Sequence, residues 1–174
     1  MSVLQPPKPA KLVIGIFTAE VNIVETLVPE LISHFGRIDV VSPWMAFNYT
    51  HYYEPEMGSP LHRRVYSFKS LIGQQDLANV KIATHQIEQA YSKSGRRRVN
   101  IDPGYLVRER FVLASGKNFS HRICIGAGIY ADLTLIYQKG RFRQLPWTYP
   151  DYADGGMLNF LEKVRKKYIW DDYD

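Results

Sequence analysis

Residues 129–143 read Ile-Tyr-Ala-Asp-Leu-Thr-Leu-Ile-Tyr-Gln-Lys-Gly-Arg-Phe-Arg. The first nine alternate between two kinds of side chain, which is typical of a half-buried β-strand. One face carries Ile129, Ala131, Leu133, Leu135 and Tyr137, and the other carries Tyr130, Asp132 and Thr134. Lys139-Gly140 predicts a tight hairpin turn into a second strand at 141–143. This stretch therefore predicts antiparallel sheet.

The rest of the chain mixes strand and helix patterns. Short apolar runs predict strands at 12–19, 38–47, 63–72, 99–102, 111–114 and 122–125, and helical spacing predicts helices over 23–35, 76–91 and 157–168. Pro29 predicts a kink or a later start in the first helix, and Asp102-Pro103-Gly104 predicts a turn. The fold class is α+β, with mixed α/β as the alternative: a β-α-β opening, then a largely antiparallel sheet with two further helices.

Length and composition indicate an ordinary globular chain. Its 174 residues suit one domain over 11–170, after a Pro-rich lead-in at 1–10 and before an acidic tail at 171–174. No apolar run approaches the ~18 residues of a membrane span. Cys124 is the single cysteine, so no disulfide forms within the chain, and its apolar neighbours predict that it is buried. We expect a cytoplasmic protein that does not contact a membrane, and its oligomeric state stays open.

Two glycine motifs are misleading. Residues 126–131, Gly-Ala-Gly-Ile-Tyr-Ala, match the dinucleotide fingerprint G-x-G-x-x-A, but that fingerprint requires a helix at the point where this sequence predicts a strand. Gly116-Lys117 lacks the upstream glycine of a phosphate loop. We therefore expect neither a dinucleotide fold nor a phosphate-loop site.

Three polar segments carry the candidate catalytic residues. His51, Glu54 and Glu56 combine an imidazole with two carboxylates, which suits acid–base chemistry or a divalent cation. A solvated loop is the simpler interpretation of this segment. Asp102 ends a predicted strand, where carboxylates often act in catalysis, although an Asx turn explains it as well.

The third segment runs from 117 to 134 and continues at 147–152. His121 and Asp132 are its acid–base candidates. Lys117 and Arg122 are suited to binding an anion, because Arg binds a phosphate or carboxylate through two parallel hydrogen bonds. The proposed ligand-binding set is Lys117, Asn118, Arg122, Tyr130, Thr134 and Tyr149. An unremarkable solvent-facing ladder is the alternative for Tyr130, Asp132 and Thr134.

The same segments resemble a known family. The motifs are residues 47–58 (Phe-Asn-Tyr-Thr-His-Tyr-Tyr-Glu-Pro-Glu-Met-Gly), 99–105 (Val-Asn-Ile-Asp-Pro-Gly-Tyr), 117–118 with 121–123, 128–135, and 147–152 (Trp-Thr-Tyr-Pro-Asp-Tyr). Together they resemble the uncharacterised bacterial domain-of-unknown-function family four-four-one-six over residues 11–168. This chain differs from the family pattern at Asp132, where Glu is usual, and at Gly116, where a larger residue is usual. The resemblance implies a family without implying a function.

Two functions remain open. The first is a domain that binds or acts on a phosphorylated or otherwise anionic, nucleotide-like small molecule in a polar cleft, with a divalent cation as a possible cofactor. Whether it is an enzyme stays open. The alternative is a non-enzymatic RNA-binding module that uses the basic runs 96–98 and 163–167 with exposed tyrosines. The net charge of +5, from 22 basic and 17 acidic residues, is compatible with both.

Overall fold

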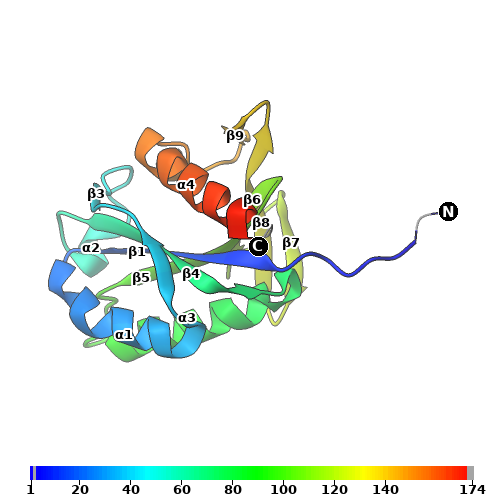
Figure 1. Ribbon diagram of the computed structural model, residues 1–174. Helices are drawn as coiled ribbons and strands as arrows, with labels where there is room; N and C mark the ends of the chain where they lie inside the picture. The colour runs from blue at the N-terminus through cyan, green and yellow to red at the C-terminus, as the bar shows by residue number, and fades with distance from the viewer. Residues whose placement is uncertain (2, 172–174) are drawn as a thin grey trace.

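The computed structural model describes residues 1 and 3–171 and contains one nine-stranded antiparallel sheet (Figure 1). The strand order is β2-β4-β1-β5-β6-β8-β7, with β3 paired to β4 and β9 paired to β8. The strands are β1 (Ala10–Thr18), β2 (Ile38–Val41), β3 (Met45–Ala46), β4 (His62–Ile72), β5 (Asn100–Val107), β6 (Arg110–Ser115), β7 (Arg122–Gly126), β8 (Ile129–Gln138) and β9 (Arg141–Gln144). The helices are α1 (Val24–Phe35), α2 (Glu54–Met57), α3 (Leu77–Tyr91) and α4 (Gly155–Asp171), with short 3-10 turns η1 (Val21–Ile23), η2 (Gln74–Asp76) and η3 (Pro150–Tyr152).

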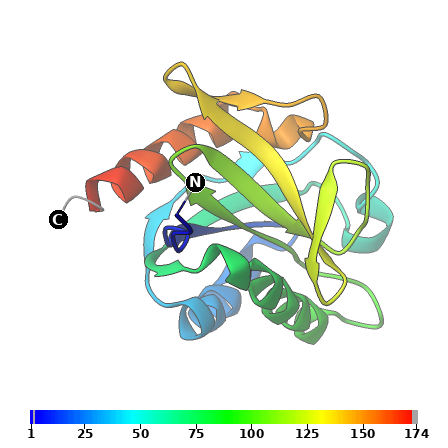
Figure 2. The same cartoon turned by 90° about the vertical axis from the view of Figure 1, so that its right-hand side faces the viewer.

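The sheet is covered on both faces, so the molecule has three layers. Helices α1 and α3 lie on one face and α4 lies on the other, as both views show (Figures 1 and 2). Strand β1 lies inside the sheet between β4 and β5, and all nine of its residues are buried. Its residues Leu12, Ile14 and Ile16 pack in the core with α1 and α3, whereas Val13 packs in the core with α4. The α+β class predicted from the sequence is therefore confirmed.

The β-α-β opening is present with one strand inserted into it. Strands β1 and β2 flank α1 in the sequence, but β4 lies between them and pairs with both in antiparallel fashion. The predicted strand over 38–47 is broken at Ser42 and Pro43 into β2 and β3. Proline has no N–H to donate to a sheet, which accounts for the break.

The predicted turn at Asp102-Pro103-Gly104 is wrong. Strand β5 runs straight through these residues, and Pro103 lies opposite Ile14 of β1. Gly104 is needed there for a packing reason, because a Cβ atom on it would lie 2.6 Å from the carbonyl oxygen of Val112. Gly104 thus allows β5 and β6 to approach closely, and the Pro-Gly pair does not reverse the chain.

The alternation in β8 changes face at Thr134. Leu133 pairs with Val112 and Leu135 pairs with Phe111, so Thr134 is an extra residue on β8, as in a β-bulge. Leu133 therefore packs in the α3-side core, whereas Leu135 packs with α4. The prediction that these apolar residues share one face is wrong beyond this point.

Glycine-containing turns lie at both ends of β8. The 126–128 segment is a left-handed turn between β7 and β8, with Ala127 at φ 51°, and a hairpin turn at Lys139-Gly140 joins β8 to β9. Pro29 lies inside α1, which starts at Val24 as one helix and does not begin later. Cys124 is exposed on the edge strand β7, so its predicted burial is wrong.

Most of the predicted acidic tail at 171–174 is not compared with the structure, because residues 172–174 lie outside the described residues. No helix in the described part of the chain combines the length and the apolar character needed to cross a membrane.

Candidate functional site

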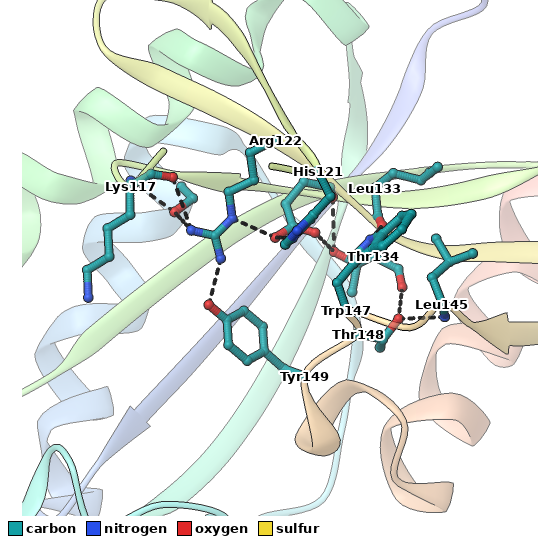
Figure 3. A network of polar contacts seen from close by, with 11 residues as sticks. Lys117, His121, Arg122, Leu133, Thr134, Leu145, Trp147, Thr148 and Tyr149 are labelled. Carbon is teal, nitrogen blue, oxygen red and sulfur yellow. Dashed lines mark hydrogen bonds and ion pairs between the residues drawn. The ribbon is translucent and has the colours of Figure 1, made fainter. Parts of the chain in front are cut away.

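Asp132 is the centre of a polar network on the α4 side of the sheet, because Leu113, which lies opposite it on β6, packs with α4. Figure 3 shows the neighbouring side chains of this network. One of its carboxylate oxygens, Oδ2, lies 3.1 Å from Nε2 of His121 and accepts a 2.9 Å hydrogen bond from Nε of Arg122. The Asp132 side chain is only 5% exposed. The extra residue at Thr134 stabilises this arrangement, because the Thr134 hydroxyl donates to the carbonyl oxygen of Asp132 at 3.0 Å.

Arg122 connects four parts of the chain. Besides Asp132, its guanidinium donates to the hydroxyl of Ser115 at 3.2 Å, to the carbonyl oxygen of Lys117 at 3.0 Å and to the hydroxyl of Tyr149 at 2.6 Å. Burial lowers the pKa of Arg122, but the bonds to Asp132 and Tyr149 outweigh it and leave the pKa raised. The guanidinium is therefore a fixed cation with four of its five N–H donors in use.

His121 lies between aromatic rings. Its imidazole stacks on the indole of Trp147, with ring centres 5.0 Å apart, and meets the ring of Phe119 edge-on at 5.5 Å. A carboxylate such as Asp132 only accepts hydrogen bonds, so Nε2 of His121 is the donor in this contact. No hydrogen bond is made to Nδ1 in the described part of the chain.

Thr148 anchors the loop that carries Trp147 and Tyr149. Its hydroxyl donates to the carbonyl oxygen of Thr134 at 2.6 Å and accepts from the backbone N–H of Leu145 at 2.8 Å. The indole N–H of Trp147 donates to the carbonyl oxygen of Leu133 at 2.8 Å. These bonds attach the loop to the bulged part of β8, as Figure 3 shows.

A second polar cluster is centred on Arg63, which the sequence analysis did not single out. Its side chain is 4% exposed, forms an ion pair with Asp151, and lies 3.5 Å from Oδ2 of Asp102. The guanidinium also lies over the rings of Phe47, Tyr152 and Phe17, at 4.7, 5.0 and 5.4 Å from their centres. Strand alternation in the sequence indicates the burial of Arg63. Arg63 and the buried Val65 are two residues apart, so they lie on the same face of β4.

Burial controls the protonation of this second cluster. It raises the pKa of Asp151, although the nearby Arg63 opposes that shift. Burial also raises the pKa of Tyr152 well above its usual range, again against the effect of Arg63. Tyr152 is therefore a neutral phenol at any ordinary pH.

Tyr53 packs beside the second cluster, with its ring centre 4.8 Å from that of Phe17. Burial raises the pKa of its phenol, and the carboxylate of Asp102 raises it further, against the effect of Arg97. Asp102 is 28% exposed and makes no hydrogen bond through its carboxylate within the described residues.

Lys117 lies at the outer edge of the first cluster. Its side chain extends to the same side of the sheet as Tyr149 (Figure 3), and its ammonium lies 5.3 Å from the centre of the Tyr52 ring. No carboxylate is within ion-pair distance of this ammonium in the part of the chain that the structure describes. Tyr52 comes from the 48–58 loop, so this loop borders the site at Lys117.

Not all of the predicted site residues join these clusters. His51 is 90% exposed and pairs with Glu54 at 3.0 Å. Glu56 forms hydrogen bonds with Arg97. These three residues do not meet His121 or Asp132 in any contact found within residues 1 and 3–171. Among the ligand-binding candidates, Asn118 is exposed in its loop, and Tyr130 is half-buried on β8 opposite Ser115 and Cys124.

The two basic runs have separate surroundings. Arg97 pairs with Glu56 and Arg98 pairs with Glu20, at the start of β5. Helix α4, which carries the 163–167 run, covers the opposite face from α1 and α3. Lys167 pairs with Asp171 there, and the Arg165 guanidinium lies 3.3 Å from the centre of the Tyr137 ring. The RNA-binding hypothesis therefore stays a prediction without a shared basic and aromatic face to support it.

A resident metal has no ready set of ligands. Among the described residues, no three His, Cys, Asp or Glu side chains gather closely enough to hold a metal ion. Asp132 is already engaged by His121 and Arg122, and Asp102 and Asp151 share Arg63.

Comparison with known proteins identifies a family. No curated protein and no solved structure matches the chain significantly. One family model does match, over residues 8–168. Since the match covers most of the chain, this protein belongs to the family described as Domain of unknown function (DUF4416).

Proposed function

We propose that the protein binds a phosphorylated or otherwise anionic, nucleotide-like small molecule at the α4 side of the sheet, between Lys117, Tyr149 and Asp102. The observation that carries the proposal is that the Lys117 ammonium has no carboxylate partner in the described part of the chain. Arg122, Arg63 and Arg97 each have a carboxylate partner, whereas the Lys117 ammonium has none within the described residues. An unpaired cation in such surroundings attracts an anion.

The surroundings of Lys117 suit a flat organic anion better than a bare ion. Tyr52 and Tyr149 are 67% and 49% exposed, so both rings are available to a ligand. The ammonium lies 5.3 Å from the Tyr52 ring centre, and the Tyr149 hydroxyl is held by Arg122. Aromatic rings beside a cation can stack a nucleobase while the cation contacts the phosphate.

The proposal is tested by isothermal titration calorimetry with adenosine and guanosine 5′-monophosphate, pyrophosphate, and uncharged adenosine. We expect the phosphates to bind and adenosine to bind much more weakly. Lys117→Met should weaken phosphate binding about tenfold, the value of one charged contact. Lys69→Met is the matched control, because Lys69 is exposed on β4 and its removal changes the net charge equally. If none of these anions binds, or if both variants weaken binding equally, the proposal is wrong.

A further inference from the structure

The Asp102 carboxylate is the polar group beside the proposed site whose hydrogen-bonding capacity is largely unused. Arg63 approaches only its Oδ2, at 3.5 Å, which is an ion-pair distance and too long for a good hydrogen bond. The side chain is 28% exposed, so the carboxylate is reachable from solvent. We infer that Asp102 binds the vicinal hydroxyls of the ligand, which makes the ligand a ribonucleotide or another phosphate ester of a vicinal diol. The inference rests on the proposed function.

Asp102 and the hydroxyl that holds Arg122 lie at the same end of neighbouring strands. The β5–β6 ladder ends at the pair Gly104 and Leu113, and Asp102 and Ser115 each lie two residues beyond that pair. Ser115 accepts a hydrogen bond from Arg122, which also donates to the backbone of Lys117. Because neighbouring strands lie about 4.8 Å apart, Asp102 is on the strand next to the residue that holds the Arg122 guanidinium. A ligand with a phosphate at one end and hydroxyls at the other fits this arrangement.

Exposed aromatic rings lie beside the cations. The Tyr52 ring centre is 5.3 Å from the Lys117 ammonium, and the Tyr149 hydroxyl accepts from Arg122 at 2.6 Å. The ring of Tyr149 is half exposed and is therefore available to a ligand. An aromatic surface beside a sugar-binding carboxylate is expected of a nucleotide site.

The chemistry of a free carboxylate favours a diol over other groups. Two carboxylate oxygens can accept hydrogen bonds from two neighbouring hydroxyls, and an acidic side chain is a common partner of ribose hydroxyls in nucleotide sites. A site built to bind a hydroxyl rejects the analogue that lacks it, because its own polar group is then left without a partner. The protein should therefore distinguish ribonucleotides from 2′-deoxyribonucleotides.

The experiment compares affinities by calorimetry for adenosine 5′-monophosphate, its 2′-deoxy analogue, ribose 5-phosphate and pyrophosphate. The wild-type protein should prefer the ribonucleotide over the deoxynucleotide about tenfold. Asp102→Asn should remove most of this preference and leave pyrophosphate binding unchanged. Asp171→Asn, which alters an exposed carboxylate on α4, is the control and should retain the preference. Ribose 5-phosphate binding as tightly as the nucleotide would identify a sugar phosphate as the source of the diol.

The outcomes separate the inference from the proposed function. Pyrophosphate binding without a preference between ribo- and deoxynucleotide would overturn the inference and leave the anion site standing. Failure of every phosphate compound to bind would overturn both. If Asp102→Asn does not fold, the comparison of ribonucleotide and deoxynucleotide affinities in the wild-type protein still tests the inference, because it requires no variant.

Discussion

Arg122 and Asp132 lie opposite each other on neighbouring strands, with the Arg122 Nε 2.9 Å from the Asp132 Oδ2. The same oxygen is 3.1 Å from His121, so one carboxylate balances a guanidinium and fixes an imidazole. All three side chains are at least nine-tenths buried. Removal of one member of such a group leaves the others uncompensated in a medium of low polarity.

Asp132→Asn should therefore destabilise the fold strongly. The amide has nearly the same shape, but it does not carry the charge that balances Arg122. We expect the free energy of unfolding to fall by about 3 kcal/mol, measured by urea denaturation. Asp171→Asn removes an exposed ion pair and should cost less than about 1 kcal/mol. Equal effects of the two variants would mean that the buried carboxylate has no special role in stability.

Arg63 and Asp151 should show energetic coupling. Arg63→Met leaves the carboxylate of Asp151 buried without its cation, and we expect a loss of about 3–5 kcal/mol. Asp151→Asn in the same chain removes that unpaired charge, so the double variant should be more stable than the sum of the single losses predicts. A double-mutant cycle by chemical denaturation measures this coupling. Simple additivity would contradict it.

The sequence predicts elements better than it predicts partners. Alternation predicted β8, and helical spacing predicted α3 and α4, because each pattern depends on residues that are close in the chain. The sequence motifs contain Lys117, His121, Arg122, Asp132 and Tyr149, but they do not show which of these residues contact one another. The pairing of Arg63 with Asp151, 88 positions apart, depends on strand order, which no local pattern contains.

The errors have local physical causes. Thr134 adds a residue to β8, and one extra residue moves every later side chain to the other face. Pro103-Gly104 has the composition of a turn, but tertiary pairing with β1 keeps the backbone extended. Cys124 has apolar neighbours in the sequence and still lies exposed, because β7 is at the edge of the sheet. In each case sheet packing overrides local composition.

Thr148→Val should loosen the loop that carries Trp147 and Tyr149. The methyl group that replaces the hydroxyl neither donates to Thr134 nor accepts from Leu145, so two backbone groups lose their partners. We expect a loss of about 2 kcal/mol in unfolding free energy. Thr148→Ser keeps the hydroxyl and should lose less than about 1 kcal/mol. Similar losses in both variants would show that the hydroxyl is not what holds the loop.

Glu56 should make the fold sensitive to acid. Side-chain hydrogen bonds from Arg97 lower the pKa of Glu56 below its usual value of 4.5, against the opposing effect of burial. The folded protein therefore holds this carboxyl proton less tightly than the unfolded chain does. The resulting contribution to stability is complete above pH 4.5 and is lost as the pH falls through the folded pKa.

The measurement is the difference in unfolding free energy between wild type and Glu56→Gln from pH 7 to pH 3. The difference should stay constant down to about pH 5 and then shrink, because protonated glutamic acid and glutamine are both uncharged. Arg97→Gln should produce the same change of profile, and the double variant should add little, since Arg97 lowers the Glu56 pKa through their shared bonds. A difference that grows on acidification would contradict the lowered pKa, and a full extra effect in the double variant would show that the two side chains act independently.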